Sequence, residues 1–169
     1  MNTLSGRPDA ELETMRDVVV HRLQNLYEVT REILQAMPDI AEAVGSPQLK
    51  QAITAYLERT RGQLSRLEQA FELIGESPQA AVLHTVDRLR QGRDQRVKQA
   101  RRDPLTDADV IDAARQVEHY EFVTLRPVPS HVKQWGQPRL TELLEEILEE
   151  ERETDKSLTE IMEAVVREK

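Results

Sequence analysis

Hydrophobic residues recur at intervals of three and four along four long stretches of the chain. This spacing is typical of amphipathic helices, because at about 3.6 residues per turn it gathers apolar side chains on one face. The stretches cover roughly residues 9–36, 47–74, 104–125 and 139–169. Turn signals at residues 45–47, 75–78 and 136–138 separate them, together with a longer connection after the second stretch. We therefore predict an antiparallel four-helix bundle.

Proline residues and one shorter segment modify this arrangement. Pro127 and Pro129 follow the third helix, and proline cannot occupy an unbroken helix interior, so the chain is expected to kink or unwind there. Pro38 is likewise expected to bend or restart the first helix. A short amphipathic segment at residues 82–89 lies in the longer connection. We expect a lead at residues 1–8 and one all-α domain at residues 9–169, with one or two short extra helices.

Composition narrows the class of protein. Of the 169 residues, 32% are charged and 4% are aromatic, which is typical of an all-helical chain. The net charge of −8 argues against a nucleic-acid binder, because phosphate contacts need an excess of lysine and arginine. The lack of cysteine excludes disulfides and thiolate metal sites. Since neither a secretion signal nor an apolar run of about 20 residues is present, we expect no membrane contact and a cytoplasmic location.

Acidic residues occupy positions where the helical period requires hydrophobic side chains. Glu151 lies near the centre of the apolar stripe of the fourth helix, and Glu121 is in phase with the stripe of the third. Asp155 lies one turn beyond Glu151 at the margin of the stripe, while Glu118 points toward the flank of its helix. Carboxylates that face a bundle core are costly unless a cation meets them, so these acids mark a candidate site.

A bundle with inward carboxylates is the arrangement in which ferritin-like proteins hold two iron or manganese ions. Hard cations prefer oxygen ligands, and all four helices normally contribute. In this chain the corresponding positions are Thr30 in the first helix and Arg59 and Gln63 in the second. Because a guanidinium is repelled by divalent cations, Arg59 is expected to pair with Glu121 or Glu151 instead.

Four short stretches resemble the YciE/YciF family of ferritin-like stress proteins, and the similarity covers residues 17–166. They are residues 26–28 (LYE), 57–63 (LERTRGQ), 114–121 (ARQVEHYE) and 149–155 (EEERETD). The resemblance implies a ferritin-like bundle, a homodimer, a dinuclear metal site and a role in stress. The positions that match the family's site are Glu118, Glu121, Glu151, Asp155 and Gln63. Thr30 and Arg59 stand where the family has glutamate.

Two main functions follow from this pattern. The first is a stress-associated protein without a cofactor and without enzymatic activity, in which Arg59 replaces the metal charge and Thr30 replaces an acid. The second is a residual carboxylate site that binds iron or manganese and supports redox chemistry of peroxide or oxygen. The sequence favours the first, because acids are missing from two helices. A third function, binding of an acidic partner by the basic residues between 88 and 102, is favoured least, since no aromatic residue lies among them.

Overall fold

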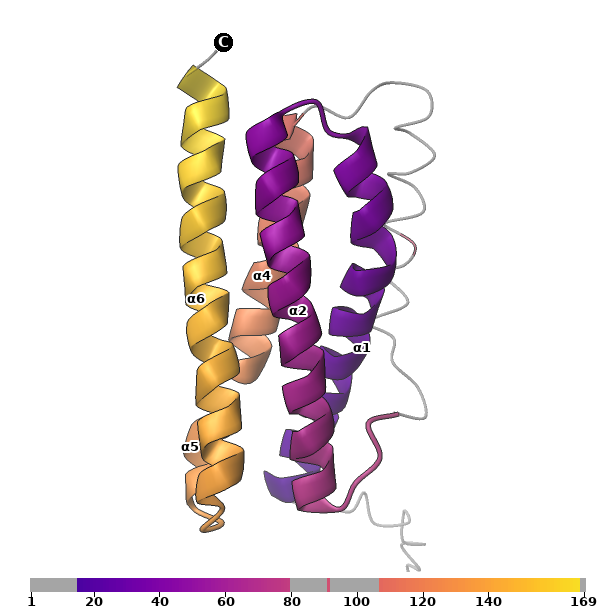
Figure 1. Cartoon of the computed structure of the whole chain (residues 1–169). Helices are drawn as coiled ribbons and strands as arrows, with labels where there is room; N and C mark the ends of the chain where they lie inside the picture. Colours follow the sequence, from indigo (N-terminus) through magenta and orange to yellow (C-terminus); the bar gives the residue numbers. More distant parts are fainter. Residues whose placement is uncertain (1–14, 80–90, 92–106, 168–169) are drawn as a thin grey trace, which may run out of the picture.

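The computed structural model describes residues 15–79, 91 and 107–167, and every element below lies within these ranges. Four long helices stand side by side, each antiparallel to both of its neighbours (Figure 1). They are α1 (Met15–Ala43), α2 (Pro47–Ile74), α4 (Asp107–Leu125) and α6 (Pro138–Arg167), and the short helix α5 (Val128–Lys133) lies between α4 and α6 in the chain. α1 packs on α2 and α4, and α6 packs on the same two helices. The predicted all-α four-helix bundle is confirmed.

Several sequence predictions concern residues outside the described ranges. They are the lead at residues 1–8, the first helix turn near Asp9, the amphipathic segment at residues 82–89, the basic residues between 88 and 102 and the helix start near Pro104. These predictions stay untested, as does the domain boundary at residue 9.

Local capping bonds fix the ends of α2 and the turn before it. Ser46 Oγ accepts the backbone N–H of Leu49 at 3.3 Å, which satisfies a donor in the first turn of the helix. The Asp107 carboxylate, at the start of α4, accepts the N–H groups of Gly45 and Ser46 at 3.1 and 3.0 Å. At the opposite end, α2 stops at Gly75, whose φ of 68° is left-handed and free of a side-chain clash. The α1–α2 turn is thereby tied to the start of α4.

Proline has different effects in α1 and after α4. Pro38 lies inside α1, which continues to Ala43, so the predicted helix end near residue 36 is wrong. The hydrogen bond lost at Pro38 is offset by packing, because Met37 is buried and Ile40 contacts the same hydrophobic cluster. Pro127, by contrast, directly precedes the separate helix α5, and this confirms the predicted interruption of the third helix.

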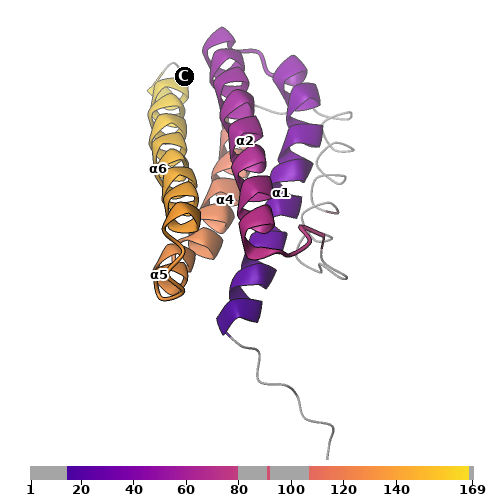
Figure 2. The same ribbon diagram turned by 60° about the horizontal axis from the view of Figure 1, so that its bottom comes forward.

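Helix α5 and the following turn close one end of the bundle (Figure 2). Val128 and Val132 of α5 are fully buried, and Trp135 is partly buried against the same hydrophobic cluster. Gly136 has a φ of 65°, a left-handed conformation that lets the chain turn into α6. The predictions that this turn contains Gly136 and that Trp135 packs at the end of the bundle are both confirmed.

The interior consists of two hydrophobic clusters with buried polar residues between them. The first cluster, near α5, includes Leu23, Leu67, Phe71, Leu125 and Leu144. The second cluster, at the opposite end, includes Ile33, Ile53, Ile111 and Leu158. Between these positions each long helix carries buried polar side chains, which together form the polar layer: Thr30, Thr60, Gln63, Glu118, Glu121, Glu151 and Thr154. All four long helices therefore contribute to one polar level inside the bundle.

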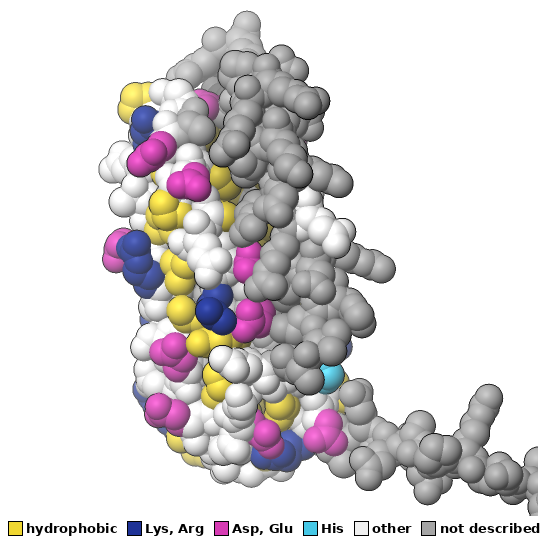
Figure 3. Space-filling view, turned by 90° about the vertical axis from the view of Figure 1, so that its right-hand side faces the viewer, with side chains coloured by type: hydrophobic (Ala, Val, Ile, Leu, Met, Phe, Trp, Pro, Cys, Tyr) yellow, Lys and Arg dark blue, Asp and Glu magenta, His cyan; other side chains and the backbone are white. Residues whose placement is uncertain are grey.

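The described surface carries charges of both signs. On the side of the molecule where α1 lies, acidic and basic side chains are interspersed around a column of hydrophobic side chains (Figure 3). Within the part of the chain that the structure describes, no helix combines the length and the apolar content that a membrane crossing requires.

Candidate metal centre

Three glutamates converge in the polar layer from two neighbouring helices. Glu118 and Glu121 lie on α4, where a spacing of three residues places them on adjacent turns of one face. Glu151 reaches the same point from α6, and ligand oxygens of the three carboxyls lie within 4.8 Å of one another. Each of these residues is at most 2% exposed. The structure thus brings together three of the acids that the sequence proposed.

Several oxygens of this cluster have no hydrogen-bond donor. Among the described residues, no donor in normal hydrogen-bond geometry reaches either carboxyl oxygen of Glu118 or the Oε2 atom of Glu151. Buried polar atoms are nearly always partnered, and an unpaired buried charge is costly. Because the three carboxyls face one another, a proton carried by one of the acids or a bound cation can serve as the partner.

Burial and mutual repulsion raise the pKa of all three acids. Desolvation, followed by the charges of Glu121 and Glu118, raises the pKa of Glu151 to about 12. Desolvation is also the main cause of the raised pKa values of Glu118 and Glu121. A protonated Glu151 donates to Glu118, an interaction that raises the pKa of Glu151 and lowers that of Glu118. Without a cation, the cluster therefore holds protons at neutral pH.

Thr30 interacts directly with the cluster from α1. Its Oγ1 atom lies 2.8 Å from the carbonyl oxygen of Leu26 and 3.1 Å from Oε1 of Glu121. A hydroxyl has one proton and cannot donate to both acceptors at once. When Thr30 donates to Leu26, its bond with Glu121 requires a proton on the glutamate. Desolvation and the charge of Glu118 raise the pKa of Glu121, and the contact with Thr30 lowers it.

Gln63 lies in the polar layer beside the acids. It is 4% exposed, and its amide favours the ionised form of Glu151, which lowers the pKa of that carboxyl. The sequence placed Gln63 at the edge of the core face of its helix, whereas the structure buries it. Gln63 can therefore orient Glu151 or offer its own amide oxygen to a cation.

Arg59 does not form the ion pair that the sequence predicted. Its Nη1 atom donates to Thr154 Oγ1, and among the described residues no ion pair joins Arg59 to Glu121 or Glu151. The Thr154 hydroxyl donates in turn to the carbonyl oxygen of Glu150 at 2.9 Å, so it acts as an acceptor toward Arg59. The nearby guanidinium charge lowers the pKa of Glu118.

The positions of Glu118 and Asp155 are reversed relative to the sequence prediction. Glu118 was expected at the flank of its helix and is buried. Asp155 was expected beside Glu151, but its side chain is 58% exposed and its Oδ1 atom lies 3.6 Å from Arg115 Nε. The side of α6 that faces the interior carries Thr154, three residues after Glu151, rather than Asp155, four residues after it. Asp155 therefore lies outside the carboxylate cluster.

Tyr56, which lies in the apolar phase of its helix and was expected mainly to fill the core, with donation to the acids as the alternative, is a neighbour of the cluster. Burial is the main reason that the pKa of Tyr56 lies well above its ordinary value. The charge of Glu118, with which the Tyr56 hydroxyl interacts, raises this pKa further. The position of Tyr56, four residues before Thr60 and seven before Gln63, places all three side chains on one face of α2. That spacing was a usable signal, but an aromatic ring in an apolar phase is ordinarily a core residue.

The residues of the polar layer fit one divalent cation rather than two. Glu118, Glu121 and Glu151 supply hard carboxylate ligands, and Gln63 adds an amide oxygen. When ionised, the three carboxylates and the guanidinium of Arg59 together carry a charge of minus two, which one divalent cation neutralises. A second cation would exceed that charge and be repelled by Arg59.

The chain matches the family defined as domain of unknown function DUF892 over residues 14–169. It belongs to the DUF892 family. Protein YciF of Escherichia coli strain K12 is 30% identical over 151 residues, a match that spans 89% of this chain and 91% of YciF. The resemblance to YciE/YciF proteins is therefore confirmed for nearly the whole of this DUF892 chain.

Solved structures show the same fold as this DUF892 chain. The E. coli stress protein YciF superposes with a TM-score of 0.74 at 30% identity and covers 94% of this chain and 100% of its own. YcfI from Rhodopseudomonas palustris gives a TM-score of 0.77 at 26% identity, with 89% of this chain and 96% of YcfI covered. A Xanthomonas campestris protein at 22% identity, with a TM-score of 0.71, covers 90% of this chain and 94% of its own and supports the fold alone.

Proposed function

We propose that this protein is a YciF-type stress-associated protein whose bundle core binds one iron or manganese ion through Glu118, Glu121 and Glu151. The stress-associated role rests on its relation to the E. coli protein, which is described as a stress protein. The metal-binding role rests on one observation, the buried oxygens of Glu118 and Glu151 that lack donors among the described residues.

The chain's own residues would prepare the site for a cation. The two hydrophobic clusters exclude water from both ends of the polar layer, and Gln63 orients Glu151. The carboxyls must lose their protons to bind a metal, so binding releases protons and strengthens as the pH rises. When bound, iron would supply redox chemistry and manganese either redox or Lewis-acid chemistry. The proposal covers metal binding and includes no enzymatic reaction.

The raised pKa values support a second function, a non-enzymatic protein without a cofactor. In that form protonated Glu151 donates to Glu118, Glu121 accepts from Thr30, and Arg59 supplies the positive charge. The sequence favours this function. Protons on the acids and the Tyr56 hydroxyl can satisfy the donor-free oxygens in that form. We place the metal first because oxygens of three carboxyls from two helices lie within 4.8 Å of one another, an arrangement that one cation satisfies at once.

Metal analysis distinguishes the two functions. Protein purified anaerobically from cells supplied with iron and manganese should contain about one ion per chain, since the cluster can neutralise one divalent charge. Glu151→Gln keeps the shape of the side chain but removes its charge, so the metal content should fall to near zero. Asp155→Asn is the matched control on α6 and should keep the ion. A metal content near zero in the unaltered protein, even after titration with ferrous iron, would favour the second function.

The family resemblance also supports a homodimer located in the cytoplasm. Light scattering at several protein concentrations and cell fractionation test these two parts of the proposal separately from the metal.

A further inference from the structure

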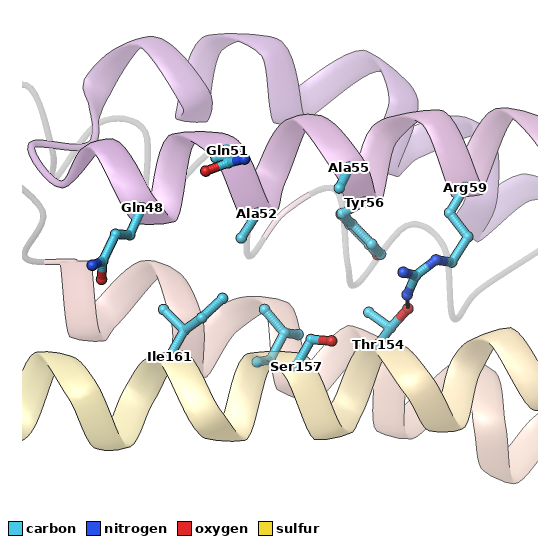
Figure 4. Close-up of a pocket in the computed structure, with 10 residues that line it drawn as sticks. Gln48, Gln51, Ala52, Ala55, Tyr56, Arg59, Thr154, Ser157 and Ile161 are labelled. Atoms are coloured by element: carbon cyan, nitrogen blue, oxygen red, sulfur yellow. Dashed lines mark hydrogen bonds between the residues drawn. The ribbon is translucent and has the colours of Figure 1, made fainter.

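A groove of about 290 Å³ runs between α2 and α6, outside the carboxylate cluster (Figure 4). Ala52 and Ala55 on α2 and Leu158 and Ile161 on α6 form the apolar part of its walls, which Gln51, Tyr56, Thr154 and Ser157 also line. Arg59 lies at one end of the groove, and Gln48 lies at the other, eleven residues earlier on α2. At about 1.5 Å per residue this separation is roughly 16 Å. The groove is therefore long, narrow and largely apolar, with a cation at one end.

Among the described residues, Arg59 is the arginine of α2 that forms no ion pair. Arg61 pairs with Glu58, and Arg66 pairs with both Glu146 and Glu150. Within the described residues, Arg59 makes one side-chain hydrogen bond, from Nη1 to Thr154, and no ion pair. A guanidinium has five N–H donors, so Arg59 keeps donors available at the end of the groove. A half-buried guanidinium of this kind favours an anion with two oxygens in one plane.

We propose that this groove binds an aliphatic monocarboxylate whose carboxylate group pairs with Arg59 and whose hydrocarbon chain lies against Ala52, Ala55, Leu158 and Ile161. Charge complementarity fixes the head of the ligand, and the apolar walls fix the tail. Alanines at two of the lining positions on α2 leave space beside the helix for a hydrocarbon chain. A small inorganic anion would leave these walls in contact with water, and a cation would be repelled by Arg59.

The site requires no metal, so its test uses the full-length protein after chelation. Titration calorimetry with butanoate, hexanoate and octanoate should show binding that strengthens roughly three- to fourfold for each added methylene that enters the groove. Octylamine has the same tail and the opposite charge, and it should bind at least tenfold more weakly than octanoate.

Variants identify the groove as the location. Arg59→Gln should weaken octanoate binding tenfold or more, because it removes the charge-assisted hydrogen bonds. Arg61→Gln is the matched control, since Arg61 is an exposed arginine on the same helix, and it should leave binding unchanged. Ala52→Leu fills the groove, suits a helix and leaves Arg59 in place, so it should remove the dependence on chain length.

Three binding results would overturn the proposal. They are equal binding of octanoate and octylamine, no effect of Arg59→Gln in a variant that keeps its helical circular dichroism, and no dependence on chain length. If Arg59→Gln does not fold, the Ala52→Leu variant decides the matter. If the protein is a dimer that Ala52→Trp dissociates, and octanoate does not bind, a second copy of the chain covers the groove. This result would also overturn the proposal. None of these results bears on the metal content that tests the proposed function.

Discussion

The two sides of the polar layer carry opposite kinds of hydrogen-bonding group. The α4 and α6 side presents three buried carboxyls, several of whose oxygens lack donors among the described residues. The α1 and α2 side presents the hydroxyls of Thr30 and Tyr56, the amide of Gln63 and the guanidinium of Arg59. The backbone is that of a bundle able to bring acids from four helices to one level. The difference teaches that the charge of such a site, and hence the number of cations it can hold, depends on a few side chains rather than on the fold.

The largest expected effect comes from placing acids on α1 and α2, so that both sides of the polar layer carry carboxyls. The double variant Thr30→Glu, Arg59→Glu adds two acids and removes the guanidinium, so it should raise the metal content from about one ion per chain to about two. Without metal, the extra buried charge should lower the free energy of unfolding by several kcal/mol. Metal analysis after anaerobic titration with ferrous iron, and urea unfolding of the chelated protein, measure the two effects.

The neutral pair Thr30→Gln, Arg59→Gln is the control for that experiment. It changes the same positions without adding acids, and its metal content should stay near one ion per chain. If the acidic double variant also stays at one ion, the number of carboxylates does not limit the capacity of the site.

A smaller effect is expected from pH in the chelated protein. Glu151 has a folded pKa raised to about 12, so between its lower unfolded pKa and 12 the folded state binds more protons than the unfolded state. The stability that Glu151 contributes is therefore fully present at acidic pH below the unfolded pKa and is lost as the pH rises. The slope is up to about 1.4 kcal/mol per pH unit for each proton. Urea unfolding between mildly acidic and mildly alkaline pH measures it.

Glu151→Gln separates this slope from the titration of other groups. The amide cannot ionise, so the variant should lose less stability than the unaltered chain over the same pH range, and it should be the more stable of the two at alkaline pH. Equal slopes in both proteins would mean that Glu151 is ionised in the folded state without metal.

The smallest effect on stability is expected from the ion pairs that join α2 to α6 outside the polar layer. Arg66 on α2 contacts Glu146 and Glu150 on α6 at 3.1 and 2.9 Å, and its side chain is 26% exposed. Because water screens such a pair, Arg66→Gln should lower the free energy of unfolding by about 0.5–1 kcal/mol, and high salt should reduce the loss. Arg61→Gln, which removes an exposed pair within α2, should cost less. A loss of several kcal/mol at Arg66 would instead indicate a dehydrated pair.

Much of the fold could be predicted because its signals are local. Ser46 and Gly75 act through bonds within a few residues, and they bound α2 as expected. The end of α1 was mispredicted because Pro38 is tolerated through packing with another part of the chain, which no local signal reports. The short turns between the periodic stretches added the antiparallel bundle topology, which periodicity by itself leaves open.

The site could be predicted only in part, for a related reason. Periodicity found Glu121 and Glu151, because both interrupt an apolar stripe. It misplaced Glu118 and Asp155, because both lie at the edge of an apolar stripe. At such an edge the sequence does not show whether a side chain faces a neighbouring helix or water. The partner of Arg59 could not be predicted either, since it depends on which side chain of α6 lies within reach of a long, flexible arginine.

The division of the interior into two hydrophobic clusters has a consequence for how the molecule opens. Few apolar contacts cross the polar layer, so the end near α5 and the opposite end can exchange their amide hydrogens as two separate cooperative units. A cation bound by Glu118, Glu121 and Glu151 would lie at the boundary between these units. Its binding would make the two ends open together, and its loss would let one end fluctuate while the other stays closed.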